Sequence, residues 1–188
     1  MMCTCQRPRL RLSLAFVAMA LVLAPLPLAA QDQPWASAEG LAREVYSAVS
    51  ATGGQTPDWN RVRSFFLPEA VVVLRTSRTA MSVFSLDGFV KDFVDFYERP
   101  MKVGDKAVTP KVDGFTERLV QLKSWVFGDI AHILVLYEAH IPGSSRPPQQ
   151  GVDSWELVRR EGRWWIAAVT NEIVTPDRPV PPELRTKP

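Results

Sequence analysis

Two strand-like segments meet at Glu161-Gly162, and this pair constrains the fold more than any other part of the sequence. Residues 152–158 and 163–169 are rich in β-branched and aromatic residues, and the charged turn between them ends in glycine. Glycine readily accepts the positive φ that a tight hairpin turn needs. Trp164 and Trp165 are adjacent, so in a strand they point to opposite faces. The pattern predicts a β-hairpin in a sheet covered on both faces, by helices on one side and by a second subunit on the other. The alternative is that one tryptophan lies exposed at a sheet edge.

The first 30 residues have the composition of a secretory signal peptide. Arg7, Arg9 and Arg11 precede an apolar run at 12–24, and small residues follow up to Ala30. This order predicts Sec-type export to the periplasm or the exterior, with cleavage after Ala30. A retained membrane anchor is the alternative, and the two prolines directly after the apolar run disfavour it.

Cys3 and Cys5 are the only two cysteines, and both lie in the segment that is predicted to be removed. The mature chain would therefore form no disulfide, thiolate metal site or cysteine nucleophile. Cleavage also removes three arginines and no acidic residue, so the formal net charge changes from +2 to −1. A near-neutral chain lacks the basic surface of nucleic-acid-binding proteins. We therefore expect no nucleic-acid partner, and no membrane partner after signal cleavage.

Helical patterns come first along the mature chain, and strand patterns follow. Ser37 precedes an apolar repeat that continues to Val49, Asp58 belongs to the start of a shorter helix that Pro68 stops, and Ser85 precedes a third helix. Residues 101–113 are expected to form a loop. Strands are expected, besides the hairpin, at 70–74, 80–84, 115–127 and 130–141. Helices followed by antiparallel strands predict an α+β domain.

Three stretches carry a family resemblance: residues 66–73, residues 127–133 with Tyr137-Glu138, and the hairpin at 151–166. They resemble the nuclear transport factor 2-like (NTF2-like) superfamily, and its SnoaL-like and DUF4440-like bacterial members most of all. The resemblance covers residues 37–172. It implies a cone in which about three N-terminal helices pack inside a curved, mostly antiparallel sheet, with a pocket at the open end. The expected organisation is a signal peptide at 1–30, a lead at 31–36, the NTF2-like domain at 37–172 and a disordered Pro-rich tail at 173–188.

The sequence indicates no metal or cofactor. His132 and His140 are the only histidines. They lie eight residues apart in one predicted strand, which separates their Cα atoms by about 26 Å. Neither a Gly-x-Ser-x-Gly nucleophile elbow nor a Gly-rich phosphate loop is present.

Acid–base chemistry on a small apolar molecule is the remaining option. Glu138 is the first catalytic candidate, because it interrupts an apolar strand and an apolar pocket would raise its pKa. Its alternative is a solvated carboxylate paired with Arg118 or Arg159. His132 and Tyr46 are the other catalytic candidates, and a surface histidine is the alternative for His132. The expected pocket residues are Tyr46, Phe93, Tyr97, Glu117, Leu134, Leu136 and Trp164.

Three functions are compatible with these patterns. The first is a non-catalytic exported domain with a pocket for a small apolar ligand, forming a homodimer through its sheet. The second is a lyase or isomerase of the SnoaL-like type that works by acid–base catalysis. The third is a protein-interaction module of the cell envelope. An enzyme needs at least two polar groups within reach of one enclosed apolar cavity, so pocket geometry distinguishes these hypotheses.

Overall fold

The structure, a computed structural model, describes residues 33–77 and 79–185. The predicted signal peptide therefore lies outside the described residues. In chain order the elements are η2 (Pro34–Ala36), α1 (Ala38–Ala48), α2 (Trp59–Arg63), β1 (Phe66–Arg75), β2 (Met81–Ser85), α3 (Leu86–Glu98), β3 (Met101–Val103), β4 (Lys106–Val108), α4 (Pro110–Asp113), β5 (Thr116–Phe127), β6 (Ile130–His140), β7 (Gln149–Arg160), β8 (Arg163–Ile173) and η3 (Pro182–Leu184). No helix among the described residues is long and apolar enough to cross a membrane.

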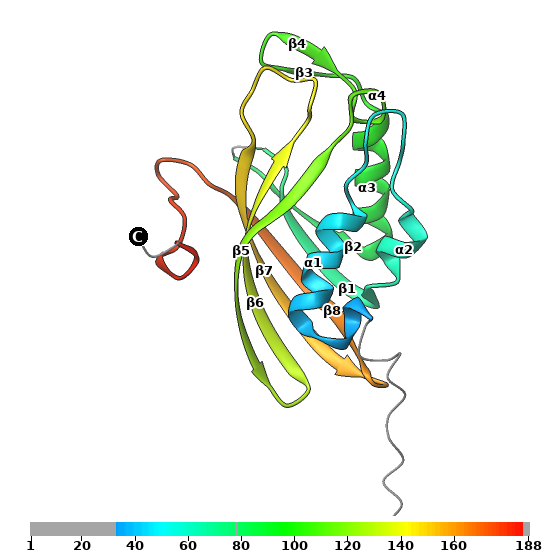
Figure 1. Cartoon of the computed structure of the whole chain (residues 1–188), viewed down its shortest axis with the longest axis vertical. Coiled ribbons are helices and arrows are strands. Elements are labelled where there is room, and N and C mark those ends of the chain that lie inside the picture. The colour runs from blue at the N-terminus through cyan, green and yellow to red at the C-terminus, as the bar shows by residue number, and fades with distance from the viewer. Residues whose placement is uncertain (1–32, 78, 186–188) are drawn as a thin grey trace, which may run out of the picture.

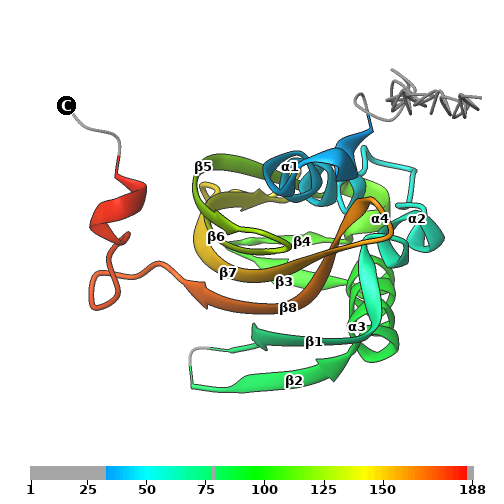
Figure 2. The same cartoon turned by 90° about the horizontal axis from the view of Figure 1, so that it is seen from below.

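One six-stranded sheet organises the molecule, with the strand order β2-β1-β8-β7-β6-β5. Neighbouring strands are antiparallel, except that β1 and β8 run parallel. The sheet curves around α1 and α3, which lie against its concave side (Figures 1 and 2). The predicted α+β architecture, with a few helices packed in a curved sheet, is confirmed.

The helices begin where the sequence predicts a cap. The side chains of Ser37 and Ser85 accept hydrogen bonds from the backbone N–H groups of Gly40 and Gly88, at the starts of α1 and α3. Asp58 accepts two such bonds at the start of α2. These side chains satisfy N–H groups that lack a partner inside the helix.

Two segments differ from the secondary structure that the sequence predicts. Residues 101–113, expected to be a loop, instead form the hairpin β3–β4 and the short helix α4. The second helix ends at Arg63 rather than at Pro68, and Pro68 lies within β1. Short elements of three to five residues carry too few periods for a sequence pattern to show them.

The hairpin β7–β8 forms as the sequence predicts. Glu161 and Gly162 have φ angles of 56° and 78°, which gives the tight turn its twist. Trp164 packs in the core with 4% of its surface exposed. Trp165 lies on the other face, where its Nε1–H donates to the backbone oxygen of Arg160 and the guanidinium of Arg163 lies 3.9 Å from its ring.

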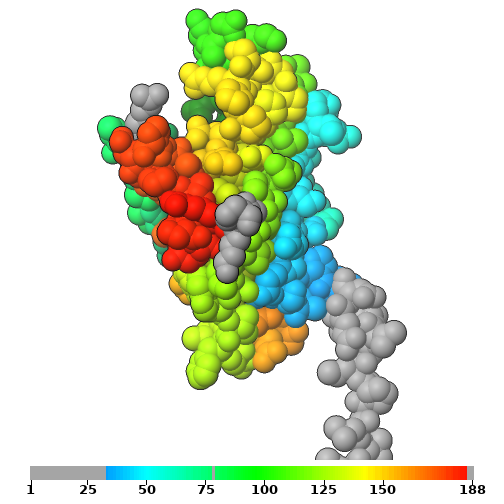
Figure 3. Space-filling view, turned by 60° about the vertical axis from the view of Figure 1, so that its left-hand side comes forward, coloured from blue at the N-terminus to red at the C-terminus, as the bar shows by residue number. Residues whose placement is uncertain are grey.

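The C-terminal segment covers part of the convex face of the sheet. Residues after β8 cross this face, and η3 lies next to β5 and β6 (Figures 1 and 3). Leu184 has only 1% of its surface exposed, and Leu136 on β6 is also buried. The structure thus differs from the expected disordered tail, because a single leucine among the prolines anchors the segment on apolar strand positions.

Candidate active site

A cavity of about 500 Å³ lies between the concave face of the sheet and the helices α1 and α3. Cavities of this size hold small organic molecules. Most of its wall is apolar, and the aromatic part of the lining consists of Phe66, Phe89, Phe93, Phe96, Phe115 and Trp155, besides two tyrosines. The charged residues Arg75, Asp92 and Arg99 also contribute to the lining, and Arg99 is exposed.

Glu117 is the carboxyl group that faces this cavity from β5. Its backbone is fixed to the segment directly after α1, because its N–H donates to Ser50 Oγ at 2.8 Å and its carbonyl accepts from the same hydroxyl at 3.2 Å. Within the described part of the chain its carboxyl oxygens have no hydrogen-bond partner. Burial raises the pKa of Glu117 from the usual 4.5 to about 8, and the charge of Asp153 adds to the rise. The group is therefore mostly protonated at neutral pH and releases its proton slightly above it.

Asp153 faces the cavity from β7, and both of its carboxyl oxygens accept hydrogen bonds. It accepts a hydrogen bond from the hydroxyl of Tyr46 at 2.5 Å and another from Asn171 Nδ2 at 2.7 Å. Burial raises the pKa of Asp153, while the hydrogen bonds from Tyr46 and Asn171 oppose that rise. The same Asn171 nitrogen donates to the hydroxyl of Tyr137 at 2.8 Å. A continuous chain of polar groups thus crosses the floor of the cavity.

Both tyrosines in this chain remain neutral donors. Burial is the main reason why the pKa values of Tyr46 and Tyr137 rise well above 10, and the nearby charge of Asp153 raises both further. The proton of Tyr46 is used by Asp153, whereas Tyr137 accepts from Asn171 and has no acceptor among the described residues for its own proton. Tyr137 is consequently the donor that is free to bind an oxygen atom in the cavity.

Strand pairing brings these residues together. Asp153 on β7 lies directly opposite Asn171 on β8, and both point to the concave face. Tyr137 on β6 lies opposite Gly151, where a Cβ atom would stand 2.3 Å from the tyrosine hydroxyl. Glycine at position 151 therefore leaves the space that the Tyr137 ring occupies. That ring also stacks on Tyr46, with 5.7 Å between ring centroids.

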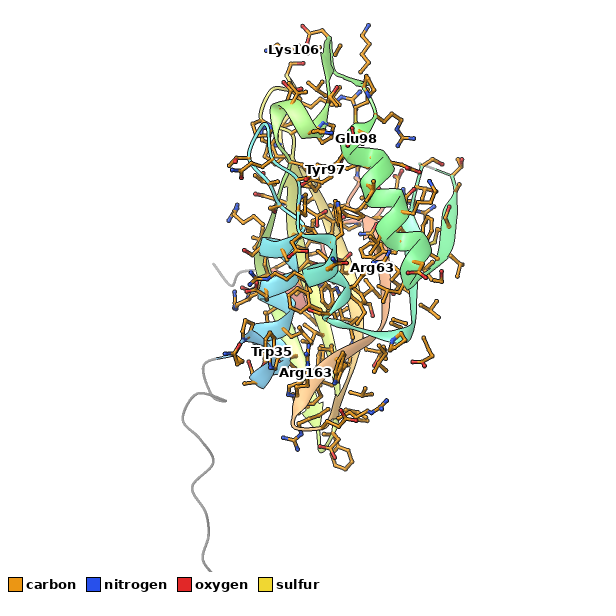
Figure 4. The ribbon with its side chains drawn as sticks, turned by 90° about the vertical axis from the view of Figure 1, so that its right-hand side faces the viewer. Trp35, Arg63, Tyr97, Glu98, Lys106 and Arg163 are labelled. Atoms are coloured by element: carbon orange, nitrogen blue, oxygen red, sulfur yellow. The ribbon has the colours of Figure 1, made fainter. Side chains whose placement is uncertain are left out.

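Tyr46, Phe93 and Glu117 are the expected pocket residues that the structure places in the cavity wall. Tyr97 lies in the last turn of α3 (Figure 4) and does not line the cavity; its hydroxyl donates to the backbone oxygen of Val49 at 2.8 Å. Trp164, near the start of β8, packs in the hydrophobic core and does not line the cavity.

Four further residues that were expected in the site lie on β6 and point away from the cavity. Glu138 points to the convex face, where it forms an ion pair with Arg118 at 2.5 Å. Hydrogen bonds from Gln150 and from Arg118 lower the pKa of Glu138, the reverse of what a buried general base requires. His132 Nδ1 lies 2.8 Å from a carboxylate oxygen of Glu156 on the same face. Leu134 and Leu136 have the same parity, so they do not reach the cavity either. For Glu138 and His132, the structure therefore agrees with the alternative hypotheses, a carboxylate paired with Arg118 and a surface histidine.

Sequence reasoning missed Asp153, Asn171 and the role of Tyr137. Strand alternation could have shown the first two. Asp153 points to the same face as Trp155, and Asn171 points to the same face as Val169. Each is therefore a polar residue among inward-facing apolar ones. No group of three or more potential metal ligands occurs in residues 33–77 and 79–185.

Comparisons with known proteins identify the architecture. No family profile matches the sequence, and no curated protein matches it. Solved structures do match. A Novosphingobium aromaticivorans protein described as NTF2-like with a cystatin-like fold shares 12% identity, over 74% of this chain and 85% of its own, with a TM-score of 0.52. The chain has an NTF2-like fold. This agreement confirms the resemblance at the level of the fold.

Two further structural neighbours come from the same organism. One has the provisional name aromatic ring hydroxylase, with 17% identity, coverage of 73% of this chain and 87% of its own, and a TM-score of 0.53. The other has the provisional name scytalone dehydratase, with 10% identity, coverage of 73% and 81%, and a TM-score of 0.50. At these identities the likeness concerns the fold alone.

Proposed function

We propose that the cavity binds a small, largely apolar molecule and that Glu117 transfers a proton to or from it, in a reaction of the lyase or isomerase type. The observation that carries this proposal is the Glu117 carboxyl itself, which faces an apolar cavity with a pKa of about 8 and has no hydrogen-bond partner in the described residues. A proton-transfer group works best when its pKa lies near the working pH.

The other polar groups fit complementary roles. Tyr137 supplies a neutral O–H to an oxygen of the bound molecule, where it would stabilise negative charge that develops during proton transfer. Asn171 orients that hydroxyl, and Asp153 orients Asn171. Glu117, Tyr137 and Asp153 all line the same mostly apolar cavity, and this grouping of polar side chains supports the catalytic proposal. The provisional name of one neighbour, a dehydratase, is compatible with this reaction type.

Hydrogen–deuterium exchange tests the proposal without knowledge of the substrate. A panel of small cyclic and aromatic ketones is incubated with the protein in deuterium oxide, and exchange at the carbon next to the carbonyl is followed by NMR. We expect exchange with at least one ketone, and a loss of about 100-fold or more in Glu117→Gln. Glu138→Gln is the matched control, because this carboxylate lies on the convex face, and it should keep the wild-type rate.

The other possible results of this experiment would favour the two alternative functions, the non-catalytic binding domain and the protein-interaction module. Binding of ketones without deuterium exchange would favour the first alternative, a non-catalytic domain that binds a small apolar ligand. A cavity that binds none of them would favour the interaction module.

Export and dimerisation remain proposals alongside the catalytic one. Supporting export are the basic and apolar segments before Ala30. For a homodimer through the sheet, the support is the partly apolar convex face of β1, where Val71 is 45% exposed. Native mass spectrometry of the exported protein reports the cleavage site, the number of subunits and any retained ligand in one measurement. A monomer that begins at Met1 would contradict both proposals.

A further inference from the structure

A second cavity, of about 460 Å³, adjoins the apolar cavity. Arg75, Thr76 and Ile173 line both of them. Arg75 and Ile173 are the last residues of β1 and β8, which run parallel and lie side by side (Figure 2), so the two strands end at the same edge of the sheet. The rest of the second lining is mostly polar and comes from Ser77, Gln149 and the turn after β8. The apolar cavity therefore continues past Arg75 into a polar one.

Arg75 places a guanidinium group at the boundary between the two cavities, and its side chain is only 15% exposed. A guanidinium has five N–H groups. Glu172 accepts one hydrogen bond from Nε at 2.9 Å and another from Nη2, which occupies the side of the group that faces Nε. The remaining N–H groups, on Nη1 and Nη2, have no acceptor among the described residues, and we call them the free end. Because largely buried donors are costly without an acceptor, the free end favours an oxygen atom in the cavities.

A second arginine gives this boundary an excess of positive charge. Nη1 of Arg178 lies 3.4 Å from the same Glu172 carboxylate, so one carboxylate faces two guanidinium groups. The hydrogen bond from Arg75 is the main reason why the pKa of Glu172 is lowered, and Glu172 is therefore ionised at neutral pH. Asp177, the acidic residue in the lining of the second cavity, is exposed, so solvent screens its charge. The excess at the boundary corresponds to one singly charged anion.

Arg75 also lies next to the polar chain that crosses the apolar cavity. Its backbone N–H donates to Asn171 Oδ1 at 3.4 Å, and Asn171 Nδ2 donates to the hydroxyl of Tyr137. One side chain thus contacts both Arg75 and Tyr137, the residue that we propose binds a carbonyl oxygen. Arg99 and Asp92, which also line the apolar cavity, have opposite formal charges and leave the excess at Arg75 unchanged. A single small molecule can therefore present a carbonyl oxygen to Tyr137 and an anionic group to Arg75.

We propose that the molecule bound in the apolar cavity is a small oxo acid, and that the free end of the Arg75 guanidinium binds its carboxylate where the two cavities meet. Parallel N–H groups match the two oxygens of a carboxylate, and such charged pairs are stronger than hydrogen bonds between neutral groups. A phosphate group would bring up to two negative charges to a boundary that has an excess of one positive charge. This inference rests on the proposed function for the carbonyl group at Tyr137, and it adds the chemical class of the substrate.

The affinities of matched acids and amides test the proposal. The probes are aryl oxo acids with chains of increasing length, together with the primary amide of each, and isothermal titration calorimetry measures every dissociation constant. We expect at least one acid to bind to wild type about tenfold or more tightly than its amide, because a hydrogen bond to a charged group is stronger than one to a neutral group. Arg75→Gln should weaken the binding of that acid about tenfold and leave the affinity for the amide unchanged.

Arg118→Gln is the matched control. Arg118 also pairs with a glutamate, but on the convex face, and its substitution changes the net charge by the same amount. This variant should keep the wild-type preference for the acid. If no acid binds to wild type more tightly than its amide, the proposal is overturned, and this comparison needs no substituted protein. Equal weakening of acid and amide binding in Arg75→Gln would also overturn it, because Arg75 would then support the shape of the cavity and not bind the carboxylate.

Deuterium exchange at the carbon next to the ketone of the same probes separates this inference from the proposed function. A preference for the acid without any exchange would refute proton transfer by Glu117 and would support the carboxylate site. Exchange that depends on Glu117, with equal affinities for acids and amides, would support proton transfer and refute the carboxylate site.

Discussion

Replacing Glu117 by glutamine should remove a large part of the pH dependence of stability. The folded protein holds the Glu117 proton up to about pH 8, whereas the unfolded chain releases it near 4.5. Between these values the folded state binds more protons than the unfolded state, so the free energy of unfolding decreases as the pH rises. Glutamine is a neutral, nearly isosteric substitute for the protonated acid, and it keeps its stability across that window.

The magnitude follows from the two pKa values. The difference between 4.5 and about 8 corresponds to an upper limit of about 5 kcal/mol, at about 1.4 kcal/mol per pKa unit. Because each group titrates over about two pH units, the wild type should lose about 4 kcal/mol relative to Glu117→Gln between pH 5 and pH 9. Near pH 5 the two proteins should be almost equally stable, and at pH 9 the variant should be the more stable one.

Urea unfolding followed by tryptophan fluorescence at a series of pH values measures this difference. Glu69→Gln, which removes an exposed carboxyl group from β1, is the control and should follow the wild-type profile. Parallel profiles for wild type and Glu117→Gln would refute the reasoning, since they would mean that Glu117 has the same pKa in the folded and unfolded states. The proposed proton transfer would then lose its physical basis.

Three other substitutions test the surroundings of the cavity. Gly151→Ala should displace the ring of Tyr137 and destabilise the protein by about 1–3 kcal/mol in urea unfolding, because the new Cβ would lie 2.3 Å from the hydroxyl; an unchanged midpoint would contradict the close approach. Tyr97→Phe should lower stability by about 1–2 kcal/mol, because the buried Val49 carbonyl loses its donor, yet deuterium exchange should persist; a loss of exchange at normal stability would place Tyr97 in the site. Leu184→Ala should lower stability by about 2 kcal/mol and speed proteolysis after residue 173, and protease resistance equal to wild type would show that the C-terminal segment is held by other contacts.

Local rules were sufficient to predict most of the fold. Ser37 and Ser85 begin helices because a hydroxyl before an apolar repeat can cap free N–H groups. Glu161 and Gly162 form a hairpin turn because their neighbours are strand formers and glycine accepts positive φ. The prediction was wrong for segments whose structure depends on only a few residues. β3, β4 and α4 are too short to show a period, and Leu184 anchors a segment whose prolines suggested disorder.

The sequence by itself determined the class of the domain and which residue types could carry chemistry, because hydrophobic period and capping act within one segment. Only the tertiary structure decided which of those residues meet. Glu138 and Glu117 lie in neighbouring strands, yet Glu138 faces solvent and pairs with Arg118 while Glu117 faces the cavity. Arg118 pairs with Glu138 and Glu117 pairs with Ala139, so strand alternation turns the two glutamates to opposite faces of the sheet. A carboxyl group becomes an acid–base candidate only when pairing across strands places it away from water.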